Sequence, residues 1–202
     1  MIKQIGLLLF SLMFMFSCKD GKQVILGETP WQRDMNAAFK DASQSPLKDK
    51  DRRNFTTLDF FPVDSTYVVK AHLTRTPDAL PFKMKTTTER LPEYVQYGIL
   101  TFELNGATHQ LRIYQNLDLV KESGKEELLF LPFLDTTNGE TTYGGGRYID
   151  TKIPQGDTLW IDFNQAYNPY CVYNENYSCP IVPLENTVNT EVKAGVKAYK
   201  KY

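Results

Sequence analysis

Apolar residues near the start of the chain recur at the spacing of a helix. Intervals of mostly three or four residues separate Trp31, Met35, Ala38, Phe39 and Ala42, which places these side chains on one helical face. Thr29 is followed by Pro30 and, three residues on, by Gln32; this is the capping-box pattern, with proline at the first helical position. The pattern predicts a helix from Thr29. The segment 45–55, "SPLKDKDRRNF", repeats this order with Ser45 as cap, and predicts a second short helix or a turn.

After Phe60 the period changes to two, which is the period of a β-strand. In the stretch 67–73, apolar residues alternate with the rest: Tyr67, Val69, Ala71 and Leu73 against Val68, Lys70 and His72. Asn105-Gly106, between the runs 97–104 and 107–114, predicts a hairpin with a two-residue turn. Partner positions then sum to 211. This register puts His109 opposite Phe102 on the apolar face, and Tyr97 opposite Tyr114 on the polar face.

Further strands are predicted over 127–135, 141–150, 157–163 and 187–195. Pro132 indicates a bulge or a sheet edge within the first of these, and "TKIPQG" (151–156) reads as a hairpin connection between the second and third. Strands about ten residues apart, with turn residues between them, predict a mainly β fold at the α+β margin. We expect an antiparallel β-sandwich or barrel-like sheet with one or two short N-terminal helices.

The first eighteen residues, "MIKQIGLLLFSLMFMFSC", have the order of a secretory signal: Lys3, an apolar run, then Ser17-Cys18. The run is shorter than the about 20 residues that span a bilayer. Cys18 resembles the lipidated cysteine of bacterial lipoproteins; the alternative is a plain secretory peptide. We therefore predict a signal peptide over 1–17, a tether over 18–28 and a single β-rich domain over 29–202. Lipid on Cys18 would make the membrane a partner and hold the domain in the cell envelope, at the outer membrane facing the periplasm.

Composition narrows the classes of function. The chain has 202 residues, of which 42% are hydrophobic, and its net charge is −1. A domain of this length buries a core without help from metals or disulfides. Because no long basic run is present, nucleic acid is excluded as the main partner. We also predict that the protein uses no cofactor.

Three consecutive glycines, Gly144, Gly145 and Gly146, precede Arg147. Such a loop can cradle an anion with its backbone N–H groups, but that use needs a following helix, and here a strand follows. A tight turn or bulge with positive φ values is the favoured interpretation. Arg147 suits bidentate binding of a carboxylate or phosphate. Its alternative role is a buried pair with Asp150 or Asp162.

The cysteines and histidines offer two further chemistries. Cys171 and Cys179 are separated by seven residues, and with His72 and His109 they lack the spacing of a zinc site, so we predict no metal. A Cys–His nucleophile would need a free thiol beside His109, which is more often a core histidine. Outside the cytoplasm two nearby cysteines form a disulfide. A bond between Cys171 and Cys179 would close a short loop and stabilise the fold by about 2.5 kcal/mol.

Carboxylates and amides near the tyrosine-rich stretch "YNPYCVYNENYSCP" (167–180) complete the candidates. Asp150 and Asp162 could act as acid and base if they faced one another, and Glu185 lies nearby in sequence. The alternative is that they are solvated strand residues or partners of Arg147. The predicted ligand-binding set is Gly144, Gly145, Gly146, Arg147, Asp150, Asp162, Asn164, Tyr167 and Asn168.

Several stretches together resemble a family of uncharacterised bacterial proteins, DUF1684. They include "SPLKDKDRRNFTTLDFFPVD" (45–64), "YGILTFELNG" (97–106), "LFLPFLDTTNGETTYGGGRYID" (129–150) and "IDFNQAYNPYCVYNENYSCPIVP" (161–183). The resemblance runs from about residue 31 to the end of the chain. It implies a conserved domain of unknown function, often in an exported lipoprotein, and it carries over no catalytic residue.

The functional hypothesis is a lipid-anchored envelope domain that binds a small molecule, a glycan or a peptide. Tyrosine faces can stack on sugars or peptides, and asparagines supply donors and acceptors. Two other classes stay open at this point. One is an enzyme, using Asp150 and Asp162 or a Cys–His pair, and the other is a structural envelope protein without a ligand.

Overall fold

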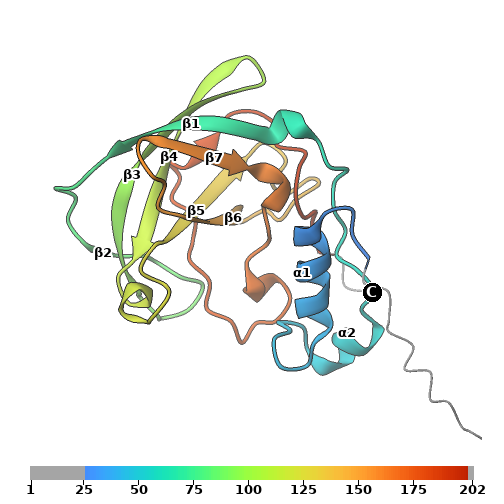
Figure 1. Cartoon of the computed structure of the whole chain (residues 1–202). Coiled ribbons are helices and arrows are strands. Elements are labelled where there is room, and N and C mark those ends of the chain that lie inside the picture. Colours follow the sequence, from blue (N-terminus) through green and yellow to red (C-terminus); the bar gives the residue numbers. More distant parts are fainter. Residues whose placement is uncertain (1–25, 200–202) are drawn as a thin grey trace, which may run out of the picture.

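The structure, a computed structural model, describes residues 26–199 of the chain. Two helices come first, α1 (Pro30–Lys40) and α2 (Asp49–Asn54). The strands are β1 (Val68–Arg75), β2 (Phe82–Lys83), β3 (Glu93–Leu104), β4 (Ala107–Asn116), β5 (Leu128–Asp135), β6 (Arg147–Lys152), β7 (Thr158–Asp162) and β8 (Thr187–Val188). Short 3-10 turns lie at η1 (Ser65–Tyr67), η2 (Leu119–Lys121), η3 (Phe163–Gln165) and η4 (Tyr170–Val172). Figure 1 shows the strands curling round, with α1 and α2 together at one side.

The strands form one sheet in the order β6-β5-β4-β3-β1-β7, with β2 beside β3 and β8 beside β5. The pairings are antiparallel except that of β5 with β8, which is parallel. The sheet curls into a half-barrel (Figure 1). The predicted mainly β, antiparallel, barrel-like fold with two short helices near the start is confirmed.

The start of α1 follows the predicted capping box. Thr29 accepts a hydrogen bond from the Gln32 backbone, the Gln32 side chain returns to the Thr29 backbone, and Pro30 is the first helical residue. The predicted cap of the second helix is wrong, because α2 begins at Asp49 after Lys48, which makes no side-chain cap. Ser45 instead accepts from Leu47 N at 3.2 Å and donates to the Phe39 carbonyl at 2.6 Å.

The segment before α1 is held against this helix. The Asn36 side chain donates to the Leu26 carbonyl at 2.8 Å, and Arg33 donates to the carbonyls of Gly27 and Glu28 at 3.1 and 3.0 Å. Residues 26–28 of the predicted tether are therefore packed on α1. The predicted signal peptide (1–17) and the rest of the tether, with Cys18, lie outside the described residues.

The hairpin of β3 and β4 has the predicted register from Leu104–Ala107 to Gly98–Ile113. Asn105 and Gly106 adopt φ values of 51° and 77°, as this two-residue turn requires. Beyond Gly98 the register shifts through a bulge, so the predicted pairing of Tyr97 with Tyr114 is wrong. The extra residue turns Tyr97 into the main core, while Tyr114 packs on the opposite face.

The strands β6 and β7 do not form the predicted hairpin. They lie at the two ends of the strand order, where β6 pairs with β5 and β7 with β1. The apolar positions explain this placement, because Leu159 and Ile161 align with Ala71 and Val69 of β1. The connection "TKIPQG" therefore carries the chain from one end of the sheet to the other.

The predicted strand over 187–195 is reduced to the two residues of β8. Just before it, Asn186 fills a split between β4 and β5, which pair directly only at Tyr114 and Phe130. Its amide accepts from Arg112 N at 2.9 Å and donates to the carbonyls of Arg112 and Pro132 at 2.7 and 2.8 Å. Pro132 is thus neither on an edge strand nor at a bulge, because a side chain replaces the ladder there.

The two faces of the sheet carry different clusters. One face holds the main core, which includes Leu100, Leu131, Phe133, Ile149 and Phe163. The opposite face carries Met84, Tyr94 and Tyr114, with Phe130 packed against them. A third cluster joins α1 and α2 to the later loops through Phe39, Phe55, Tyr173 and Val196. Because side chains alternate along β5 and β6, each of these strands contributes to both faces.

Candidate functional site

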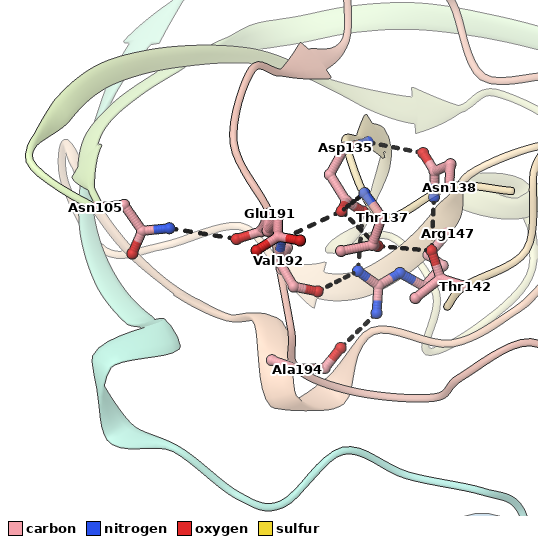
Figure 2. Close-up of polar contacts among 9 residues, drawn as sticks. All are labelled: Asn105, Asp135, Thr137, Asn138, Thr142, Arg147, Glu191, Val192 and Ala194. Carbon is pink, nitrogen blue, oxygen red and sulfur yellow. Dashed lines mark hydrogen bonds and ion pairs between the residues drawn. The ribbon is translucent and has the colours of Figure 1, made fainter. Parts of the chain in front are cut away.

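Arg147, the first residue of β6, points into the main core and has no exposed surface, at 0%. Its guanidinium forms an ion pair with Asp135 of β5 at 2.9 Å, which corrects the expected pairing with Asp150 or Asp162. The same group donates to the carbonyls of Val192, at 2.8 Å, and Ala194. Figure 2 shows the guanidinium between Asp135 and these two carbonyls. We refer to Arg147, Asp135 and the groups bonded to them as the arginine network.

The carboxylate of Asp135 completes this network. It accepts from the backbone and hydroxyl of Thr137, at 2.9 and 2.5 Å, and from Val192 N at 3.2 Å. Thr137 in turn lies 2.8 Å from the Thr142 hydroxyl (Figure 2). Burial lowers the pKa of Arg147 from its ordinary value, and the charge of Asp135 opposes the shift. The network ties the segment 190–194 to the sheet and presents no charged surface to a ligand.

The glycine triplet forms the turn that leads into β6. Gly146 has a φ of +87°, and a Cβ there would lie 2.6 Å from the Phe133 carbonyl oxygen. Its N–H donates to the Tyr143 carbonyl at 3.2 Å. Gly144 and Gly145 are exposed, and Gly144 has no such conflict. This is the tight turn with positive φ that the sequence favoured, placed where Arg147 enters the core.

Three other residues of the predicted site hold loops together. Asp162 caps η3 by accepting from Asn164 N at 3.0 Å, and it also accepts from the side chain of Gln165. Asn164 exchanges hydrogen bonds with the Asp64 backbone at 3.0 and 2.9 Å. Asn168, which is buried, donates to the Lys197 carbonyl at 2.8 Å. Asp162 does not face Asp150 across an open site.

The histidines lie elsewhere. The His109 ring stacks at 5.8 Å from Phe102, as the register predicted, and its Nε2 lies 3.2 Å from the Leu104 carbonyl oxygen. His72 is exposed on β1, 3.6 Å from Asp157. The structure therefore does not bring either histidine to Cys171 or Cys179 in the arrangement that a Cys–His nucleophile needs.

The remaining predicted residues, Asp150 and Tyr167, line an open cleft on the other face of β6. Alternation places Arg147 and Ile149 in the core and turns Tyr148 and Asp150 the opposite way. The cleft has a volume of about 420 Å³, which is within the range of small-molecule sites. Two smaller recesses, of about 120 and 170 Å³, are also lined by Asp150. We call this region the aspartate cleft.

Six aromatic rings line the aspartate cleft, and each contacts the next in this order: Tyr94, Phe130, Tyr148, Tyr167, Tyr170 and Tyr177. The centroids of successive rings are 5.8, 4.8, 5.8, 6.5 and 5.5 Å apart. We call these six residues the aromatic arc. They come from β3, β5, β6 and the loop after β7, so the curl of the sheet and one long loop together build this wall.

Asp150 is the acidic group on this wall, and it is exposed to solvent. The Tyr167 hydroxyl donates to its Oδ2 at 2.7 Å. Loss of hydration against the surrounding walls raises the pKa of Asp150, and the hydrogen bond from Tyr167 opposes this shift. The same surroundings, together with the charge of Asp150, raise the pKa of Tyr167 well above its ordinary value. The cleft thus holds a carboxylate that is easier to protonate than an ordinary aspartate.

Cys179 also lines the aspartate cleft, next to Tyr177 and Ser178. Cys171 and Cys179 are both free thiols in this structure, and they are in contact, since Cys171 N donates to Cys179 Sγ at 3.0 Å. The hydrogen bond from the Cys179 thiol lowers the pKa of Cys171 to about 7. The disulfide expected in an oxidising compartment stays a prediction, and the two residues are already adjacent.

The sequence analysis missed most of the aromatic arc. Tyr94, Phe130 and Tyr148 lie on different strands and are 18 or more positions apart along the chain, and no local pattern joins them. One signal was present. In "RYID" (147–150), Tyr148 and Asp150 are two positions apart, as are Arg147 and Ile149. Alternation along a strand therefore places the first pair on one face of β6 and the second pair on the other.

Two absences concern residues 26–199 only. In this range no three His, Cys, Asp or Glu side chains gather closely enough to hold a metal ion. Over the same residues, none of the helices combines the length and the apolar character needed to cross a bilayer.

One comparison with known proteins identifies the family of this chain. A family model described as a protein of unknown function, DUF1684, matches residues 53–197. The solution NMR structure of an uncharacterized protein of Haloarcula marismortui is similar, with a TM-score of 0.65 and 30% sequence identity. The match covers 82% of this chain and 89% of that one. A comparison with the curated proteins finds none that matches. Because the family model matches more than half of the chain, the chain belongs to the DUF1684 family.

Proposed function

We propose that this chain is a ligand-binding domain, and that a small molecule occupies the aspartate cleft. The observation that carries the proposal is the position of Asp150: a solvent-exposed carboxylate at the meeting point of three recesses, surrounded by the aromatic arc. Ligand sites combine apolar and aromatic walls with a few polar groups that orient the guest. The aspartate cleft has that composition, whereas the arginine network is closed and bonded internally.

Accessibility supports this choice. Tyr170 keeps 37% of its surface exposed at the mouth of the cleft, and Arg90 and Asn116 add polar groups to the lining. Tyr94 and Tyr148 are buried against their neighbours, whereas the exposed surface of Tyr170 gives up the gain from burial, which a purely structural role would not require. A second cleft of about 150 Å³ lies between α2 and the segment 196–199, and it is smaller and has no comparable group of aromatic rings.

A ligand-observed NMR screen of the full chain tests the proposal. The library should contain neutral, cationic and anionic small molecules, simple saccharides and short peptides. Leu119→Trp introduces a bulky ring into the cleft wall, whereas its neighbour Val120 is not among the lining residues, so Val120→Trp is the matched control. We expect hits whose binding is lost in Leu119→Trp and kept in Val120→Trp. Finding no hits, or hits equally retained in both variants, would overturn the proposed function.

We also propose that the domain is exported and anchored by lipid on Cys18. The support is the order of Lys3, the apolar run and Ser17-Cys18 in the sequence. Stable anchoring needs more than one acyl chain, so the modified protein should remain with the membrane at high salt. Metabolic labelling with palmitate, followed by membrane fractionation, should show label in the wild type and none in Cys18→Ala. An unlabelled wild-type chain in the soluble fraction would contradict the anchor.

A further inference from the structure

The carboxylate of the aspartate cleft has no ion-pair partner in the protein itself. Among the ion pairs within the described part of the chain, none includes Asp150. Arg90 lines the cleft, but its Nη2 is bonded to the Ser178 carbonyl at 2.9 Å. Asp118 acts on Tyr94 with the same sign of charge as Asp150. A ligand that reaches Asp150 therefore meets a carboxylate without an ion-pair partner, and the Arg90 guanidinium elsewhere in the lining is held by a carbonyl.

Two hydroxyl groups of the aromatic arc are already used. The Tyr167 hydroxyl donates to Asp150 at 2.7 Å, and the Tyr148 hydroxyl donates to the Pro180 carbonyl. These two rings meet edge to face, with an interplanar angle of 88°. Neither hydroxyl is therefore a free donor for a guest, whereas the Tyr170 ring keeps 37% of its surface exposed. This lining suits a guest that is attracted to ring faces more than one that needs many hydroxyl partners, such as a sugar.

The protein stacks its own cations on rings elsewhere but not here. Arg75 lies 3.6 Å from the centroid of Tyr97, and Arg147 and Lys197 each lie 5.3 Å from the rings of Phe133 and Phe61. Over residues 26–199 no such contact involves the aromatic arc. The aromatic arc and the Asp150 carboxylate thus line a space in which no cation of the described residues stacks on a ring.

We infer that the ligand of the aspartate cleft is a small organic cation, an alkylammonium compound whose charged nitrogen lies between Asp150 and the aromatic arc. The inference rests on the proposed function and adds the chemical class. A neutral guest would remove water from the Asp150 carboxylate without giving it a charge partner, which is costly. An anion would be repelled. A cation gains both the carboxylate and the ring faces, and aromatic cages with a nearby carboxylate suit quaternary ammonium groups.

Matched probes separate charge from shape. (2-Hydroxyethyl)trimethylammonium and 3,3-dimethylbutan-1-ol have nearly the same size, but only the first is charged. Each would be titrated into the ¹⁵N-labelled full chain in a neutral detergent, and backbone amide shifts would be followed at residues 148–150 and 167–180. We expect the ammonium compound to bind at least tenfold more tightly than the neutral alcohol, since desolvated cation–π contacts and one ion pair act together.

Two substitutions test the role assigned to Asp150. Asp150→Asn keeps the size of the side chain and can still accept from Tyr167, so the preference for the ammonium compound should fall to about twofold or less. Asp118→Asn makes the same change of charge outside the cleft lining and should keep most of the preference. Glucose serves as a neutral polyol in the same titration.

The outcomes are distinguishable. A tenfold preference that disappears in Asp150→Asn and persists in Asp118→Asn supports the inference. Equal or tighter binding of the neutral alcohol or of glucose, with shifts at the same cleft residues, overturns the cationic class and leaves the ligand-binding function standing. Absence of shifts with every probe overturns the inference, and the screen with Leu119→Trp then decides the proposed function separately.

Discussion

The arginine network and the aspartate cleft begin three residues apart on the same strand, yet their environments are opposite. Arg147 points into the core, where Asp135 and two backbone carbonyls bind it. Asp150 points to the other face, where Tyr167 is its hydrogen-bond partner among the described side chains and solvent reaches it. A charge that is fully enclosed and paired serves cohesion, because removing its partner is costly. A charge that is exposed in an aromatic recess keeps its binding capacity for a guest.

The largest expected effect comes from breaking the arginine network. Arg147→Ala leaves the Asp135 carboxylate buried without its cation and frees two buried carbonyls, and we expect a loss of about 3–5 kcal/mol in the free energy of unfolding. Urea denaturation followed by circular dichroism measures this loss. Arg75→Ala, which removes an exposed cation stacked on Tyr97, should cost about 1 kcal/mol or less. Similar losses for the two variants would show that Arg147 does not hold the core as we describe.

The cysteine pair beside the aspartate cleft tests how firmly the loop that carries the cleft is held. A disulfide between Cys171 and Cys179 should raise the free energy of unfolding by about 2.5 kcal/mol, because the bond reduces the conformational entropy of the unfolded chain. The check is urea denaturation of oxidised and reduced protein, with the double variant Cys171→Ser, Cys179→Ser as control. The double variant should show no dependence on oxidant. If the oxidised form is no more stable than the reduced form, the disulfide introduces strain into the folded state that cancels the expected gain.

Reactivity of the same pair gives a second readout. The pKa of Cys171 is lowered to about 7 by the hydrogen bond from Cys179, and the thiolate is the reactive form. Alkylation of Cys171 by iodoacetamide, followed by mass spectrometry, should therefore rise most steeply near neutral pH. In Cys179→Ala, which removes the thiol that donates to Cys171, the midpoint should move toward the value of an ordinary cysteine.

A glycine substitution tests the turn that delivers Arg147 to the core. Gly146→Ala places a Cβ 2.6 Å from a backbone oxygen at a φ of +87°, and we expect a loss of about 1–3 kcal/mol. Gly144→Ala meets no atom closer than 3.7 Å and should stay within about 0.5 kcal/mol of the wild type. Thermal and urea unfolding of the two variants provide the measurement. Equal stability of the two variants would show that the backbone at position 146 does not require glycine.

The smallest expected effect is a pH dependence that comes from the aspartate cleft. Asp150 shares the cleft with Tyr167 and Tyr170 from the loop after β7, with Tyr94 from β3 and with Arg90, and Asp118 is a further charge that acts on Tyr94. Its pKa is raised in the folded protein, so the folded state binds this proton more tightly than the unfolded state does. The contribution of Asp150 to stability is therefore most favourable at low pH and decreases as the pH rises through the folded pKa.

The difference between wild type and Asp150→Asn isolates this contribution. Urea denaturation over a range from about pH 3.5 to 7 should show the wild type losing stability relative to the variant as the pH rises. The variant should be as stable as the wild type at pH 7 or slightly more so, since its amide needs no charge partner. A wild type that gains stability over the variant across this range would contradict the raised pKa.

Local patterns predicted what depends on neighbours in the chain. The capping box at Thr29 and the turn at Asn105-Gly106 were both found where the sequence placed them. His109 faces Phe102 for the same reason, because a two-residue turn leaves one register. The resemblance to DUF1684 was also readable from the sequence, and the family match confirms it.

Predictions failed where a long-range contact competed with the local pattern. The bulge at Tyr97 moved one side chain to the other face, and β7 paired with β1 rather than with β6. The last predicted strand has only two residues, and just before it Asn186 takes the place of a ladder between β4 and β5. Each of these outcomes depends on a partner that is many residues away, which periodicity does not identify.

By itself, the sequence determined the family, the strand-rich composition, the hairpin register and the parity that separates Arg147 from Asp150. Only the tertiary structure decided that Arg147 pairs with Asp135 and that six aromatic rings meet beside Asp150. The physical reason is that alternation along a strand sets which face a side chain occupies, but not which strands share that face. The curl of the sheet and the return of the loop 167–180 bring those rings together, and thereby turn an ordinary strand aspartate into the centre of a cleft.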